Sequence, residues 1–84
     1  MKNLRGIIEQ IANNIKVGER EGEIYITSDY SLNIWRDEEG YSLYLYEEIE
    51  SSLEVLSFEE KKREDFIEGG IKLIEEYLHR LEKE

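Results

Sequence analysis

The 84-residue sequence contains no cysteine and has no long uninterrupted apolar run. Without cysteine the chain can form neither disulfides nor thiolate metal sites, which is compatible with a reducing compartment. Its apolar stretches are short and broken by charge, and no basic segment followed by a long apolar core opens the chain. We therefore expect no signal peptide, no transmembrane span and no membrane partner, and we expect a cytoplasmic location.

Residues suited to covalent or acid–base chemistry are scarce. The single histidine, His79, lies near the end of the chain beside Leu78, where a helix C-terminus favours histidine. No serine lies in a nucleophile-elbow pattern, and no glycine-rich phosphate loop is present. The acidic segment 37–40 lacks the alternating ligands and distal glutamate of a calcium-binding loop. We expect no catalytic residues, no cofactor site and no metal site, so the sequence does not predict an enzyme.

Length and composition predict a single folded domain over residues 1–84. A chain this short buries only about 60 to 65% of its unfolded surface, so dividing it would leave neither part with a core. The content of 39% hydrophobic and 11% aromatic residues is too high for a disordered acidic tail, despite a net charge of -10. We therefore expect the chain to fold.

Hydrophobic periodicity in the first half of the chain predicts one helix and three strands, and hence an α+β fold. Residues 1–16 carry aliphatic side chains at helical spacing, and Gly18 is predicted to cap this helix. Residues 23–46 alternate with a period of two, which predicts a three-stranded antiparallel meander. A tight turn is expected at Asp29 and Tyr30. A longer hairpin loop is expected at residues 37–40, with its glycine at positive φ.

The sequence after residue 46 predicts one short helix and one long C-terminal helix. Aliphatic side chains recur at helical spacing at Ile49, Leu53 and Leu56. Residues 53–58 could instead form a short fourth strand. Ser57 and Glu60 form a capping-box pattern, which predicts the start of the long helix. Gly69 and Gly70 interrupt its apolar stripe and indicate a kink or a close contact.

Acidic charge is concentrated in the middle of the chain. Residues 23–60 contain one basic residue, Arg36, and eleven acidic ones, whereas both ends of the chain are nearly neutral. An acidic surface attracts basic partners and repels nucleic acid, whose phosphates need lysine and arginine. Carboxylates on a rigid scaffold can instead occupy the basic groove of a nucleic-acid-binding protein. We expect such a protein as partner and no direct nucleic-acid contact, although an ordinary solvated acidic surface is the open alternative.

Aromatic residues of the predicted strands share the sheet face opposite the aliphatic one: Tyr25, Trp35, Tyr44 and Tyr46. Tyrosine and tryptophan are enriched at binding hot spots, which makes this face a candidate for partner binding. A second layer formed by residues 47–56 would instead bury it. The sequence leaves both alternatives open.

The segment Ser31–Leu43, with its acidic hairpin between two strands, resembles the small acidic phage-encoded anti-CRISPR proteins that inhibit Cas effectors by mimicking DNA. The likeness lies in the order of elements along most of the chain, and the hairpin is its only motif. It implies that Asp37, Glu38 and Glu39 contact the site where the effector recognises the motif beside its DNA target. Acidic residues of the following segment would lie beside them: Glu47, Glu48 and Glu50. It also implies action in the host-cell cytoplasm.

Two other classes of function fit the same residues. An immunity protein that neutralises a basic toxin nuclease would need the same acidic surface and small rigid fold. A structural or oligomerising module would bury the four aromatic residues in a homodimer interface. Genomic context would separate the immunity protein from the anti-CRISPR protein, and the mass in solution would reveal the homodimer.

Overall fold

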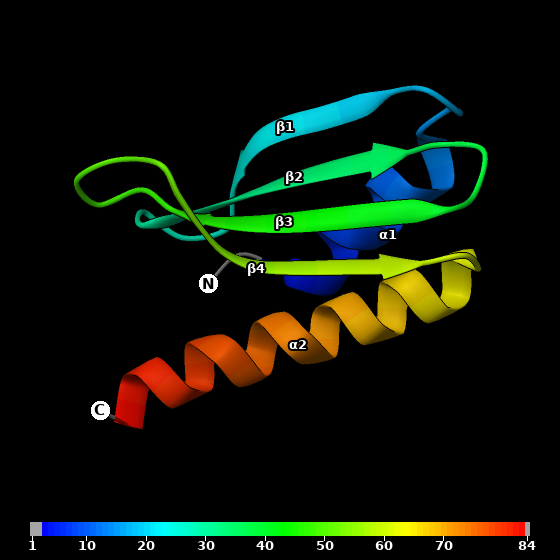
Figure 1. Cartoon of the computed structure of the whole chain (residues 1–84). Helices are drawn as coiled ribbons and strands as arrows, with labels where there is room; N and C mark the ends of the chain where they lie inside the picture. Colours follow the sequence, from blue (N-terminus) through cyan, green and yellow to red (C-terminus); the bar gives the residue numbers. More distant parts are fainter. Residues whose placement is uncertain (1–2, 84) are drawn as a thin grey trace.

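The computed structural model describes residues 3–83 as two helices and a four-stranded sheet (Figure 1). The elements follow in the order α1 (Leu4–Asn14), β1 (Arg20–Tyr25), β2 (Tyr30–Arg36), β3 (Tyr41–Glu47), β4 (Leu53–Glu60) and α2 (Arg63–Lys83). All neighbouring strands pair antiparallel, in the order β1-β2-β3-β4. The α+β class is confirmed, with one strand more and one helix fewer than the sequence predicts.

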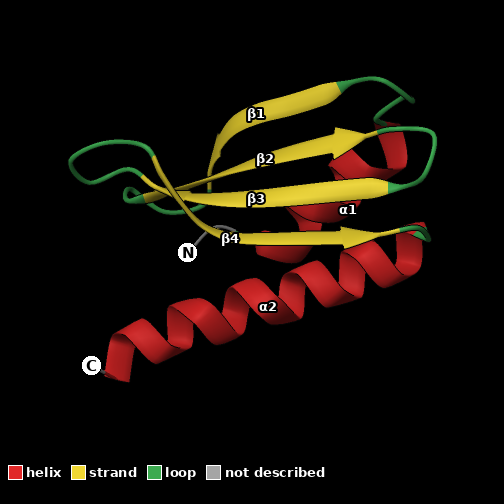
Figure 2. Ribbon diagram, viewed as in Figure 1, coloured by secondary structure: helices red, strands yellow, loops and turns green. Residues whose placement is uncertain are grey.

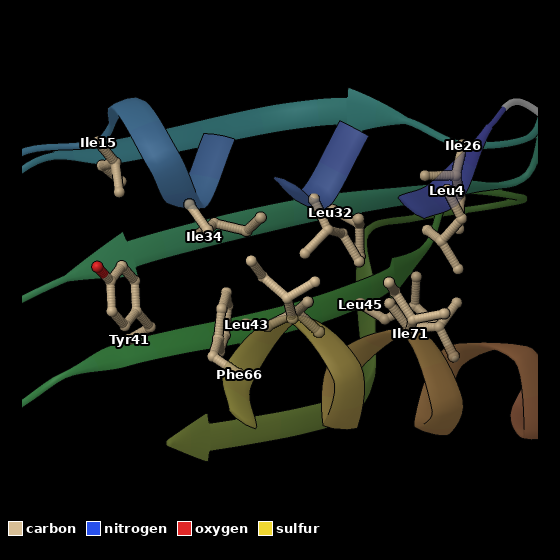
Figure 3. Close-up of a cluster of buried hydrophobic side chains, with 14 of the residues drawn as sticks. Leu4, Ile15, Ile26, Leu32, Ile34, Tyr41, Leu43, Leu45, Phe66 and Ile71 are labelled. Atoms are coloured by element: carbon tan, nitrogen blue, oxygen red, sulfur yellow. The ribbon is translucent and has the colours of Figure 1, made fainter. Parts of the chain in front are cut away.

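Both helices pack on the same face of the sheet (Figure 2). The strands β2 and β3 direct their aliphatic side chains at this face, and a single cluster of buried residues fills the space between the layers (Figure 3). Fully buried members from the two layers are Ile8, Ala12, Leu32, Ile34, Leu43, Leu45, Phe66 and Ile74. The predicted alternation of aliphatic and aromatic faces is therefore confirmed, and it determines which side of the sheet stays free of helices.

The boundaries of α1 are set by side-chain and backbone caps. The side chain of Asn3 accepts a hydrogen bond from a backbone N–H of the first turn, as an N-cap does. The helix ends at Asn14, and the extended residue Ile15 is its C-cap, so the prediction that Gly18 caps this helix is wrong. Gly18 lies in the turn that follows, at a φ of 90°. Residues 1–2, which the sequence places in this helix, lie outside the described residues.

The turn between β1 and β2 spans residues 26–29, so Tyr30 begins β2 instead of lying in the turn. The Thr27 hydroxyl oxygen accepts hydrogen bonds from the backbone N–H groups of Asp29 and Tyr30, both at 3.1 Å. The loop at residues 37–40 is found as predicted, and Gly40 has a positive φ of 155°.

Residues 53–60 form β4, so the short helix predicted from Ile49 onward is wrong and the alternative of a fourth strand is confirmed. Without β4, strand β3 would present an unpaired edge. Leu56 and Phe58 are two residues apart, and they pair with Leu45 and Leu43 of β3. This strand pairing outweighs the helical spacing of Ile49, Leu53 and Leu56. The predicted capping box is wrong for the same reason, because Ser57 and Glu60 both lie in β4 and α2 begins after them.

Gly69 allows α2 to approach the sheet closely, and Gly70 is in ordinary contact with it. A Cβ atom at Gly69 would lie 2.5 Å from Cζ of Phe58, and one at Gly70 would lie 3.4 Å from Cδ1 of Leu43. The predicted close contact is therefore confirmed. α2 extends over 21 residues. Within residues 3–83, no helix combines the length and the apolar character that crossing a membrane requires.

An ion pair joins the two helices at their exposed side. The Arg5 guanidinium donates to both carboxylate oxygens of Glu68, at 2.6 and 2.8 Å. This bidentate hydrogen bonding lowers the pKa of Glu68. The pair links α1 to α2 at the protein surface.

Candidate protein-binding surface

The sheet face opposite the helices, here called the open face, is not covered by any element of residues 3–83 (Figure 2). It carries the four aromatic residues that the sequence places together. Tyr25 and Trp35 are 44% and 45% exposed, and Tyr44 and Tyr46 are half-buried. The second layer considered for residues 47–56 does not exist, because that segment forms a loop and the edge of the same sheet.

Strand register determines the neighbours of these aromatic side chains. Tyr46 pairs with Ser31, Tyr44 with Asn33, and Trp35 with Ser42. Each of these three rings therefore lies opposite a small polar residue of the neighbouring strand, and Tyr44 and Tyr46 are neighbours on the same face of β3. Tyrosine and tryptophan are enriched at protein interfaces, so these rings suit the binding of a partner.

The predicted hairpin residues Asp37, Glu38 and Glu39 are exposed at one end of the sheet. The antiparallel pairing of β4 brings Glu59 and Glu60 to the same end, because Glu60 pairs with Tyr41 directly after the hairpin. We call these five carboxylates the hairpin acidic group: Asp37, Glu38, Glu39, Glu59 and Glu60. All of them except Glu38 line a shallow hollow. Sequence reasoning missed the last two members, although the two-residue spacing of Leu56 and Phe58 indicates the strand that places them.

The predicted acidic residues Glu47, Glu48 and Glu50 lie at the opposite end of the sheet from the hairpin. Tyr41 at the start of β3 pairs with Arg36, whereas Glu47 at its end pairs with Tyr30. The strand between the two ends has seven residues, which corresponds to a distance of about 20 Å. The expectation that these carboxylates lie beside the hairpin is therefore wrong. With the neighbouring Asp29 and Glu54, they form the loop acidic group: Asp29, Glu47, Glu48, Glu50 and Glu54.

The loop between β3 and β4 is fixed to the sheet by Glu48. Its Oε1 atom accepts hydrogen bonds from the hydroxyls of Ser31 at 3.0 Å and Ser52 at 2.6 Å. Its backbone N–H donates to the carbonyl of Asp29 at 2.7 Å. Ser31 is only 1% exposed, so one of these bonds satisfies a buried hydroxyl. The loop therefore presents its carboxylates in a defined position.

Arg36, the one basic residue between positions 23 and 60, lies on the helix side of the sheet. Its Nη1 atom donates to the carbonyl of Ile15 at 2.8 Å, and its guanidinium lies 5.1 Å from the ring centre of Tyr41. Because these contacts hold Arg36 between β2 and the end of α1, its charge does not neutralise the open face.

Glu47 contacts a buried tyrosine. The Tyr30 hydroxyl donates to Glu47 Oε2 at 3.3 Å, and the ring packs edge-on against Tyr77. Burial, followed by the neighbouring Tyr77 and Glu47, raises the pKa of Tyr30 to about 12.

This raised pKa predicts a specific loss of stability in alkali. A tyrosine in the unfolded chain ionises near pH 10, so the folded state holds the Tyr30 proton more tightly. The contribution is present below about pH 10 and is lost as the pH rises toward about 12. Urea unfolding across this range should show a steeper loss for the wild type than for Tyr30→Phe. Parallel curves would show that Tyr30 does not keep its proton.

Comparison with known proteins finds no match: no family model, no curated protein and no solved structure is similar to the chain. Within residues 3–83, no group of three or more histidine, cysteine, aspartate or glutamate side chains is arranged to hold a metal ion. The candidate site is therefore defined by the geometry of the open face alone. It consists of an uncovered aromatic face with an acidic group at each end.

Proposed function

We propose that the protein is a non-catalytic inhibitor that occupies the nucleic-acid-binding groove of a basic protein. The observation that carries the proposal is the open aromatic face with carboxylate groups at both of its ends. Arginine and lysine side chains along such a groove can bind these carboxylates in place of phosphates, while the rings contribute apolar contact area. The hairpin resemblance makes a Cas effector the proposed target and the host-cell cytoplasm the proposed place of action.

The position of the helices supports this use of the sheet. Both helices lie on the far side, so a partner can reach the exposed Tyr25 and Trp35 of the open face without displacing a helix. The sheet is rigid on that far side, where its aliphatic residues are fully buried. A preorganised surface loses less conformational entropy on binding than a flexible acidic tail would.

The hairpin carboxylates do not all have the same role. Asp37 Oδ1 accepts hydrogen bonds from the backbone N–H groups of Glu39 at 2.8 Å and Gly40 at 3.0 Å, so Asp37 holds the turn itself. Glu38 and Glu39 have exposed side chains that can be changed without breaking these bonds. A charge-reversal test should therefore replace these two residues and retain Asp37.

The proposal predicts that charge reversal at either end of the open face weakens binding to a purified Cas effector. The two variants are Glu38→Lys with Glu39→Lys, and Glu50→Lys with Glu54→Lys. Each should lose at least about tenfold in affinity, which corresponds to about 1.4 kcal/mol, because a lysine would face basic residues of the groove. Affinity would be measured by titration, and target DNA should compete with the wild-type protein.

The control variant is Glu75→Lys with Glu76→Lys, on the exposed surface of α2. Each substitution changes the charge by two units, so all three variants carry -6 instead of -10. Loss of affinity in the control as large as in the two test variants would show that only net charge matters. An absence of binding to any Cas effector would reject this target and favour a toxin nuclease, as expected for an immunity protein.

A further inference from the structure

The open face consists of three rows of side chains that run across the strands. In the first row, Tyr25 and Tyr46 both pair with Ser31, and Tyr46 also pairs with Glu54 of β4. In the second row, Asn33 pairs with Tyr44, which pairs in turn with Ser57. In the third row, the strand partners are Arg20, Trp35, Ser42 and Glu59. Each row therefore contains at least one aromatic ring, and two of the three contain a carboxylate.

One of these rings already holds a guanidinium group. The Cζ atom of Arg20 lies 5.5 Å from the centre of the Trp35 ring, within the range of a cation–π contact. Both residues are exposed, so this contact forms at the surface and not in the core. The contact shows that a planar cation can lie over a ring of this face. Tyr25, Tyr44 and Tyr46 provide further rings of the same kind.

The first row adds a carboxylate on each side of Tyr46. Glu48 is bonded to Ser31, the strand partner of Tyr46, and Glu54 is the partner of Tyr46 on the other side. Within residues 3–83, both hydrogen bonds that the Glu48 carboxylate accepts use Oε1. Its second oxygen can therefore accept from a donor on a partner. A ring between two carboxylates matches arginine, which stacks through its plane and donates through its edge.

We propose that the open face is a docking surface for an arginine-rich segment of the partner, and that it selects arginine over lysine. The inference rests on the proposed function and names the chemistry that the same surface recognises. Charge complementarity supports a cationic occupant, because Glu54 and Glu59 belong to the three rows and Glu48 is bonded to Ser31 of the first row, whereas Arg20 is the one basic residue of the rows. A second copy of the chain would bring the same carboxylates, with a net charge of -10, against themselves.

The test compares nona-arginine with nona-lysine, two peptides of equal charge, at about 150 mM salt. Trp35 is the only tryptophan and lies on the open face, so its fluorescence reports binding directly. We expect nona-arginine to bind about tenfold more tightly than nona-lysine, because only guanidinium groups stack on the tyrosine rings and donate in a bidentate manner.

The variant Tyr44→Leu with Tyr46→Leu keeps apolar side chains and removes two rings. It should reduce the preference for nona-arginine, because only Tyr25 and Trp35 remain as exposed rings, whereas Glu38→Lys with Glu39→Lys should weaken the binding of both peptides and keep the preference for arginine. Circular dichroism would establish that each variant is folded. Equal affinity of the wild type for the two peptides, or a preference that is as large in the leucine variant as in the wild type, would overturn the proposal.

Failure of this proposal can be distinguished from failure of the proposed function. Selective binding of nona-arginine without binding to a Cas effector would support the docking surface and reject the target. If the leucine variant binds a Cas effector as tightly as the wild type does, the docking surface is rejected and the proposed inhibitory function is retained. A dimeric mass in solution, with Trp35 fluorescence that neither peptide changes, would show that a second copy occupies the face and would also overturn the proposal.

Discussion

Replacing Phe66 with alanine is expected to lower the free energy of unfolding by about 4 kcal/mol, a typical cost for truncating a buried phenylalanine. Phe66 is fully buried at the start of α2. Its ring stacks against Tyr41, with ring centres 5.3 Å apart, and against Phe58, with centres 6.2 Å apart. Because Tyr41 begins β3 and Phe58 belongs to β4, the substitution removes ring contacts that join α2 to both strands.

Such a loss is large for a chain of this size. Small domains are stable by about 5 to 15 kcal/mol, so Phe66→Ala should bring the protein close to unfolding at moderate temperature. Urea titration followed by circular dichroism would measure it. Leu81→Ala in the same helix is the matched control, because Leu81 is 38% exposed and should change stability by less than about 1 kcal/mol. Equal effects of the two substitutions would contradict the central position of Phe66.

The contact between Phe66 and Phe58 also shows why part of the fold can be predicted from the sequence and part cannot. The alternation over residues 23–46 is sufficient to predict three strands and their two faces, because a period of two has no helical equivalent. The segment 49–58 carries both signals, since Ile49, Leu53 and Leu56 suit a helix whereas Leu56 and Phe58 suit a strand. Its structure is decided by the free edge of β3 and by Phe66 packing on Phe58, which are contacts distant in sequence.

The candidate site is predictable to a similar extent. The shared face of Tyr25, Trp35, Tyr44 and Tyr46 follows from strand periodicity alone. The separation of Glu48 from the hairpin depends on the length and direction of β3. The addition of Glu59 depends on β4, which the helical interpretation of this segment excludes. The carboxylates of residues 29–60 are therefore divided between the hairpin acidic group and the loop acidic group, which lie about 20 Å apart.

This distribution changes the kind of partner that suits the protein. A single acidic hairpin would bind one small basic patch, whereas two acidic groups at the ends of an aromatic face suit an elongated groove. Binding at both ends at once requires that the sheet keep its shape, in particular at the hairpin, where β3 begins next to the end of β4. The backbone at this point is therefore important for both stability and binding.

Replacing Gly40 with alanine is expected to lower the free energy of unfolding by about 3 kcal/mol, through backbone strain and steric overlap together. Gly40 has a φ of 155°, a conformation that side chains disfavour. A Cβ atom there would overlap the carbonyl oxygen of Glu60 and would lie 2.7 Å from Cα of Lys61. Because these are backbone atoms, no side-chain rotation can relieve the overlap, and the end of β4 must move away from the hairpin.

The variant Gly18→Ala separates the effect of backbone strain from the effect of steric overlap. Gly18 also has a positive φ, of 90°, but apart from its two chain neighbours no part of residues 3–83 lies within 4 Å of the position that a Cβ atom would take there. Its substitution should cost about 1 kcal/mol from strain alone, as measured by urea titration. The movement at Gly40 would also separate Glu39 from Glu59, so the folded fraction of Gly40→Ala should bind a basic partner more weakly than Gly18→Ala does. Equal stability and equal binding of the two variants would show that the hairpin does not depend on its contact with β4.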